Sequence, residues 1–94
     1  MPKIMLIRSI HMPSGSRERA IEWIRQTEEV RRQKGQVSQH FVKGITDPRE
    51  YLFIQVWESL EAYQNWKQSP ERARLAAERQ RLLTHGPVLF YEVL

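Results

Sequence analysis

Apolar and polar residues alternate along four stretches of the chain, and this period of two predicts four β-strands. The predicted strands cover residues 3–11, 36–44, 51–58 and 88–94. The third strand begins YLFIQVW and carries the strongest signal, because β-branched and aromatic residues dominate it. Residues 46–49, Thr-Asp-Pro-Arg, have the composition of a turn. The second and third strands are therefore predicted to form a hairpin.

The segment 17–34, between the first two strands, has a helical period. Its apolar stripe consists of Ala20, Trp23, Ile24 and Thr27, with Ile21 and Val30 beside it. Ser14 and Ser16 are both available as N-cap residues, and Gly35 is suited to end the helix. One helix over residues 17–34 is predicted.

Two further helices are predicted between the third and fourth strands. Ser59 precedes a short helix that has Leu60, Tyr63 and Trp66 on one face. Ser69 precedes another, with proline at its first position, which is expected to run to about residue 83. Its inner stripe consists of Leu75, Ala76, Leu82 and Leu83. The sequence His-Gly-Pro at 85–87 is predicted to be the turn that stops it.

The element order is therefore β-α-β-β-α-α-β, and residues 1–94 are predicted to form a single domain. A four-stranded antiparallel sheet with helices on one face packs these elements economically, which is the α+β, ferredoxin-like βαββαβ arrangement.

The strands carry large apolar residues on both faces, although the helices can cover only one. These residues are Leu6, Ile7, Phe53, Ile54, Val56, Trp57, Leu89, Phe90 and Tyr91. Leaving four or five of them uncovered forfeits several kcal/mol, at about 25 cal/mol per Å² of apolar area. A second copy of the chain would bury that face. We expect a homodimer with its two sheets face to face.

The chain carries 15 Lys and Arg against 11 Asp and Glu, a net charge of +4. The helical arginines alternate with glutamates, which is typical of solvated helix faces rather than of a nucleic-acid surface. They are Arg17, Arg19, Arg25, Arg31, Arg32, Arg72, Arg74, Arg79 and Arg81. No apolar segment approaches the roughly 20 residues of a membrane span, and cysteine is absent. We expect a cytoplasmic protein without nucleic-acid or membrane partners.

Residues 56–70, with the sequence VWESLEAYQNWKQSP, resemble the central pattern of the antibiotic biosynthesis monooxygenase (ABM) domain family. In that family an aromatic-acidic pair ends a strand, and a capped short helix carries Ala and an aromatic residue. A Trp or His and a Ser-Pro that opens the next helix follow. The resemblance extends in element order over nearly the whole chain.

The resemblance implies a dimeric α+β barrel with a pocket between sheet and helices in each subunit. Some members oxidise phenolic compounds with molecular oxygen and use neither metal nor flavin. A cofactor-free monooxygenase acting on a small aromatic or quinol-type compound is therefore one hypothesis. A non-catalytic dimeric domain that binds a small hydrophobic molecule, or serves a regulatory role, is the other.

The family also contains haem-degrading enzymes, and the resemblance supports that activity less. Those members combine an Asn in the first strand, a Trp at the position of Trp66, and a haem-ligating His ten residues later. Here the last position is Ala76, and the first strand offers Arg8 and Ser9. Haem binding through His11 or His40 is retained as a third, weaker hypothesis.

Cofactor-free oxidation needs an apolar slot, a proton acceptor and a donor for developing negative charge. The candidate catalytic residues are Trp66, Arg8, His40 and His11. Trp66 is either a pocket wall, as the resemblance implies, or a core aromatic. Arg8 shares a strand face with apolar residues, so it either directs an anion or oxygen, or pairs between subunits, with Glu92 as partner. The two histidines either transfer protons, as this residue type does near neutral pH, or are structural.

The candidate substrate-binding residues are Asn65, Tyr63, Trp57 and Phe53. Helical periodicity and strand alternation also account for Tyr63 and Trp57 as core residues. His85 is placed near a helix C-terminus, where a cationic side chain is favoured. No histidine pair has the spacing of metal ligands, and no phosphate loop or nucleophile motif occurs. Neither a cofactor nor a metal is expected.

Overall fold

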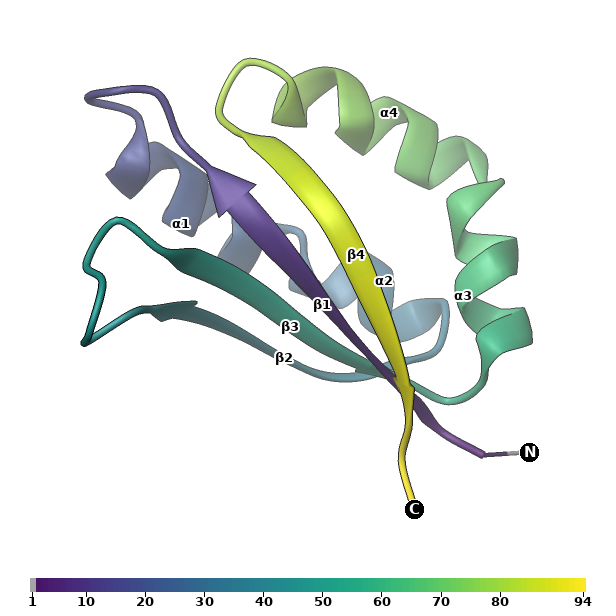
Figure 1. Ribbon diagram of the computed structural model, residues 1–94. Helices are drawn as coiled ribbons and strands as arrows, with labels where there is room; N and C mark the ends of the chain where they lie inside the picture. The colour runs from purple at the N-terminus through teal and green to yellow at the C-terminus, as the bar shows by residue number, and fades with distance from the viewer. Residues whose placement is uncertain (1) are drawn as a thin grey trace.

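The computed structural model describes residues 2–94. Its elements are β1 (Ile4–His11), α1 (Arg17–Gln26), α2 (Glu28–Gln33), β2 (Gln36–Lys43), β3 (Tyr51–Trp57), α3 (Leu60–Lys67), α4 (Pro70–Arg79) and β4 (Thr84–Glu92). The strands form one antiparallel sheet in the order β2-β3-β1-β4. The helices lie on one face of this sheet (Figure 1). The α+β, ferredoxin-like βαββαβ prediction is confirmed.

The core lies between the helices and one face of the sheet. Alternate residues of β1 and β3 point toward the helices, and Leu6 and Trp57 are completely buried there. Trp57 packs against two side chains of α3, with ring centroids 5.4 Å from Tyr63 and 5.9 Å from Trp66. These contacts fix α3 against the sheet, and its aromatic side chains with it.

Serine caps set the starts of α3 and α4, as the sequence predicts. The Ser59 hydroxyl accepts a hydrogen bond from the backbone N–H of Ala62, and the Ser69 hydroxyl accepts one from that of Arg72. Tyr63 and Trp66 are buried, but Leu60, predicted to share their face, is 46% exposed. Ser16 occupies the N-cap position of α1, yet its hydroxyl donates to the carbonyls of residues 13 and 82 instead.

The single helix predicted over residues 17–34 is wrong, because the chain forms two helices that meet at Thr27. The Thr27 hydroxyl donates to the carbonyl oxygen of Trp23 at 2.8 Å, and the same oxygen accepts from the Thr27 backbone N–H; such side-chain bonds often bend a helix. Gly35 follows α2 with φ of 115°, a backbone conformation that favours glycine.

The predicted turn at 85–87 is also wrong, because β4 begins at Thr84 and includes His85. Helix α4 correspondingly ends at Arg79, earlier than expected. Pro87 is compatible with a strand here, since β4 is an edge strand of the sheet. The register with β1 shifts between Arg8 and Ile10, which accommodates the irregular segment. His85 is thereby opposite Ile10, on the helix-covered face.

The opposite, helix-free face of the sheet is apolar too, as predicted. Its half-buried or exposed side chains include Met5, Ile7, Leu52, Ile54, Val56, Val42, Leu89 and Tyr91. Leu89 and Tyr91, on the edge strand, are 55% and 49% exposed in the single chain. This face therefore has substantial apolar area left to bury.

Replacing Ser59 with alanine should destabilise the fold by about 1 kcal/mol, the usual worth of an N-cap hydrogen bond. Tm should fall by roughly 4–8 °C for a domain of this size. Thermal unfolding followed by circular dichroism at fixed protein concentration measures the change. Ser14→Ala removes an exposed hydroxyl and is the control. Equal Tm values for the two variants would contradict the capping role.

Candidate functional site

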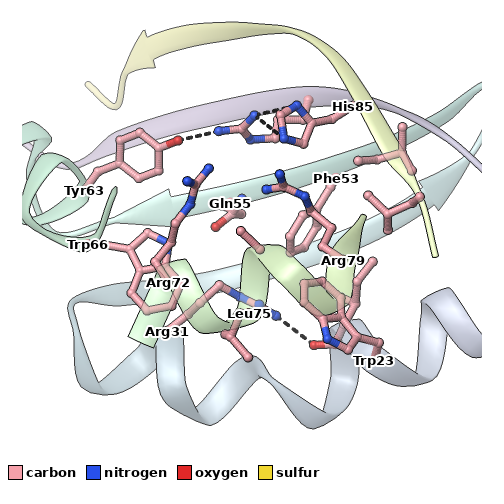
Figure 2. A pocket seen from close by; sticks show the side chains of 15 residues that line it. Trp23, Arg31, Phe53, Gln55, Tyr63, Trp66, Arg72, Leu75, Arg79 and His85 are labelled. Carbon is pink, nitrogen blue, oxygen red and sulfur yellow. Dashed lines mark hydrogen bonds between the residues drawn. The ribbon is translucent and has the colours of Figure 1, made fainter. Parts of the chain in front are cut away.

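A cavity of about 70 Å³ lies between the helix-covered face of the sheet and helices α1–α4. Strands β1, β3 and β4 supply one side of it, and α4 closes the other (Figure 2). Its basic side chains are four arginines and a histidine, which are Arg8, Arg31, Arg72, Arg79 and His85. No carboxylate is among the described residues that line it. The cavity is therefore strongly electropositive.

Arg8 links three elements at the sheet side of the cavity. Its Nη2 donates to the Tyr63 hydroxyl at 2.6 Å, and its Nη1 lies 3.1 Å from Nδ1 and 3.4 Å from Nε2 of His85. Within the chain Arg8 does not pair with Glu92, and the pairing expected between subunits stays a prediction. Glu92 lies opposite Ile4, at the other end of β1, and is exposed.

The surroundings of His85 disfavour its protonated form. The Arg8 guanidinium is a full positive charge that can only donate, so its contact with the imidazole favours the neutral ring. Burial lowers the pKa of His85 below its usual 6.5, and the positive charges of Arg8, Arg79 and Arg72 lower it further. A neutral imidazole at pH 7 is a proton acceptor, which makes His85 the best-placed base in the cavity.

Arg31 is the most deeply buried of the four arginines, with 4% of its surface exposed. Its guanidinium donates to the side chains of Thr27 and Gln39 and to the carbonyl of Ile24. It also lies over the Phe53 ring, 5.4 Å from the centroid. Desolvation lowers the pKa of Arg31 to about 10, which the charge of nearby Glu28 partly offsets. Arg31 therefore links Thr27, where α1 and α2 meet, to Gln39 of strand β2.

Arg72 and Arg79 reach the cavity from opposite ends of α4. They are seven residues apart, and Leu75 and Ala76 line the cavity between them, as expected for one helix face. Figure 2 shows both guanidinium groups extending from the helix toward His85 and Gln55. Burial and the charges of Arg72 and Arg8 lower the pKa of Arg79, so the cationic groups influence one another.

Aromatic rings supply the apolar walls of the cavity. Trp66 and Phe53 are each 7% exposed, and Trp23 is partly buried. The Trp23 indole nitrogen donates to a carboxylate oxygen of Glu78 at 3.0 Å, an exposed contact at the α4 side. A flat apolar molecule among these rings would have the cationic groups around it.

Four of the eight predicted site residues line the cavity: Trp66, Arg8, Tyr63 and Phe53. The other four do not. His40 is exposed and pairs with Ile54 on the helix-free face. His11 is exposed at the end of β1, and Asn65 is exposed on α3. Trp57 is completely buried beneath Tyr63 and Trp66, where it supports the wall rather than forming it.

The residues that sequence reasoning missed are mainly cationic. The interpretation of Arg31, Arg72 and Arg79 as solvated was wrong, since all three line the cavity. For two of them a signal existed, because Arg72 and Arg79 flank the predicted inner residues Leu75 and Ala76 at helical spacing. His85 was missed because the sequence His-Gly-Pro at 85–87 predicts a turn.

Residues 2–94 contain no group of three or more His, Cys, Asp or Glu side chains arranged to hold a metal ion. None of the described helices is long and apolar enough to cross a membrane.

Several solved structures share this fold at low sequence identity. SnoaB, a cofactor-independent oxygenase from Streptomyces nogalater, has a TM-score of 0.82 and 14% identity over 100% of this chain and 95% of its own. A conserved protein from Bacteroides thetaiotaomicron has a TM-score of 0.78 and 16% identity, covering 98% of both chains. One from Methanosarcina mazei has a TM-score of 0.77 and 11% identity, covering 97% and 92%. These similarities establish the fold.

No curated protein sequence matches the chain significantly. The family profile described as antibiotic biosynthesis monooxygenase matches residues 3–78, most of the 94 residues and all elements except β4 and the end of α4. This match, together with the shared fold, assigns the family: the chain belongs to the antibiotic biosynthesis monooxygenase (ABM) domain family.

Proposed function

We propose that the protein is a cofactor-independent monooxygenase that oxidises a small aromatic or quinol-type compound with molecular oxygen. The observation that carries this proposal is a neutral His85 beside the Arg8 guanidinium, inside a cavity with aromatic walls. The first group accepts a proton and the second stabilises the anion left behind. The structural neighbour SnoaB is a cofactor-independent oxygenase, which agrees with this chemistry.

The reaction needs no other electron source. A hydroquinone plus O₂ becomes a hydroxyquinone plus water, so one oxygen atom enters the product and the other leaves as water. The substrate supplies all four electrons. Removal of a phenolic proton makes the ring electron-rich enough to react with oxygen at carbon, and loss of water from the resulting hydroperoxide gives the carbonyl.

The proposed roles follow from the contacts around Arg8. A phenolic hydroxyl replaces Arg8 as donor to the accepting nitrogen of His85, and gives that nitrogen its proton. Arg8, still hydrogen-bonded to Tyr63 at 2.6 Å, then donates to the phenolate oxygen. The surrounding positive charge favours the ionised phenol, because nearby cations lower the pKa of an acid. Trp66 and Phe53 hold the ring and limit the access of water.

The size of the cavity favours a substrate with one ring. Its volume of about 70 Å³ is below the ~150 Å³ of an apolar cavity that admits benzene. Partial opening is therefore required even for one ring, and the half-buried Arg72 and Arg79 at the α4 side can supply it. Haem degradation is not proposed, since Ala76 stands in the cavity wall where the related haem enzymes carry their ligand.

His85→Gln should lower the rate of oxygen uptake at least ~100-fold, the usual contribution of a general base. The measurement is oxygen consumption in an electrode cell with hydroquinones, catechols and single-ring phenols, with wild type run alongside. His40→Gln and His11→Gln are the controls, since neither residue lines the cavity. We expect both to keep the wild-type rate.

Two outcomes would contradict this account. Absence of uptake with every compound would favour the non-catalytic binding domain. A rate lost in His40→Gln or His11→Gln, but kept in His85→Gln, would return the proton-accepting role to one of those residues.

The ring of His85 should titrate below pH 6.5, since burial and three guanidinium groups disfavour its protonated form. In Arg79→Gln one of these charges is lost, so the pKa should rise toward 6.5. NMR titration of the ring proton, assigned by its absence in His85→Gln, measures both values. Arg74→Gln, an exposed residue of the same helix, should leave the titration unchanged. A wild-type midpoint above 6.5 would refute the neutral His85.

We also propose that the protein is a homodimer joined through the helix-free face of its sheet. Members of this family are typically dimeric. The apolar side chains of this face, including Ile54, Leu89 and Tyr91, are half-buried or exposed in the single chain. Their burial between two copies would contribute about 25 cal/mol per Å² of apolar area.

Sedimentation equilibrium at micromolar concentration should give the mass of two chains. Leu89→Glu should shift the protein toward a single chain, because a carboxylate within the interface would be desolvated without a partner. Ile45→Glu is the control, since Ile45 is 97% exposed in the loop between β2 and β3. A wild-type protein with the mass of one chain would refute the dimer.

A further inference from the structure

The arginines of the cavity lack acidic partners. Within the described part of the chain, neither the Arg72 nor the Arg79 side chain has an ion-pair partner. Three acidic residues of α2 and α4 have other partners: Glu28 pairs with Arg32, Glu71 with Lys34, and Glu78 accepts from Trp23. Four cationic groups around one small cavity repel each other, and partial burial weakens the screening by water.

The cavity has more cationic groups than the proposed oxidation needs. That reaction needs one donor at the phenolate oxygen, and Arg8 already serves there. Arg31 is satisfied by Thr27, Gln39 and the carbonyl of Ile24. Arg72 and Arg79 remain; they belong to α4, and their guanidinium groups extend toward His85 and Gln55. Their Cα atoms are about 10 Å apart along the helix axis, at 1.5 Å per residue.

We infer that the ligand is an aromatic carboxylate, with its carboxylate held by Arg72 and Arg79 at the α4 side and its ring among Trp66, Trp23 and Phe53. This inference rests on the proposed function for the position of the reacting hydroxyl, and it names the class of substrate. Once the cavity opens, a hydroxylated benzoate offers one group to each set of polar side chains: its hydroxyl to His85 and Arg8, and its carboxylate to Arg72 and Arg79.

A carboxylate is favoured over other anions by the chemistry of the two partners. The planar guanidinium donates two parallel hydrogen bonds that match the two oxygens of a carboxylate. The aromatic lining provides the apolar contact that a bare inorganic anion cannot use. Arg72 and Arg79 are only partly buried, so they are free to rotate as the ligand enters and then close over it.

The test compares benzoate with benzamide, which has nearly the same shape and no charge. Binding to the intact wild-type protein is followed by calorimetry and by quenching of tryptophan fluorescence, since Trp66 and Trp23 line the cavity. We expect benzoate to bind at least tenfold more tightly than benzamide. Arg72→Gln and Arg79→Gln should each remove most of this preference, and Arg79→Lys should keep part of it.

Arg74→Gln is the matched control, because it removes the same charge from an exposed position of α4. It should preserve the preference. The inference is overturned if benzoate and benzamide bind equally, if neither binds, or if the preference survives in both Arg72→Gln and Arg79→Gln. It is also overturned if inorganic phosphate binds more tightly than benzoate, since the cavity would then favour a bare anion over an aromatic carboxylate.

Oxygen uptake with 2,5-dihydroxybenzoate and with hydroquinone separates this inference from the proposed function. Uptake with hydroquinone at equal or greater efficiency would support the oxygenase and refute the carboxylate site. A benzoate preference that depends on Arg72 and Arg79, with no uptake from either compound, would support the site and refute the oxygenase. Faster oxygen uptake with 2,5-dihydroxybenzoate than with hydroquinone, with this advantage lost in Arg79→Gln, would support both the oxygenase and the carboxylate site.

Discussion

The site depends on the hydrogen-bond partners of Arg8, an arginine on the helix-covered face of strand β1. Arg8 points toward the helices among Leu6 and Ile10, where a charged group must find polar partners. It finds Tyr63 on α3 and His85 on β4, so a single guanidinium joins three elements distant in sequence. Burial and the positive charge of Arg8 both lower the pKa of His85, so the neutral imidazole is favoured. The need to satisfy Arg8 thus defines the polar end of the cavity and favours the neutral form of its base.

The other arginines of the cavity add to the positive charge around His85. Arg72 and Arg79 face the same space from α4, and the aromatic rings of Trp66 and Phe53 reduce the water around them. Such a concentration of like charge is costly for a structure that binds nothing, since each cation raises the free energy of the others. An anion that enters removes this cost. The same field that keeps His85 neutral therefore favours an ionised phenol, so proton transfer and anion binding have a common electrostatic origin.

The sequence predicts the framework of this site better than its chemistry. The caps at Ser59 and Ser69 and the aromatic residues Tyr63 and Trp66 follow from local rules, so the placement of α3 was predictable. Arg79 and Arg72 were not identified, because a helix rich in Arg and Glu resembles a solvated one, and only their spacing around Leu75 and Ala76 marks them as inner residues. The placement of His85 in the cavity also depends on tertiary structure. Only the pairing of β4 with β1, around an irregular register, turns a His-Gly-Pro segment into a strand that faces the cavity.

The most direct test of the account is a crystal structure of the protein with 2,5-dihydroxybenzoate bound in the absence of oxygen. The account predicts a ring hydroxyl within hydrogen-bond distance of an imidazole nitrogen of His85 and of the Arg8 guanidinium, with the carboxylate on Arg72 and Arg79. A ligand bound outside this cavity, or with its carboxylate on Arg8 and no hydroxyl near His85, would contradict it.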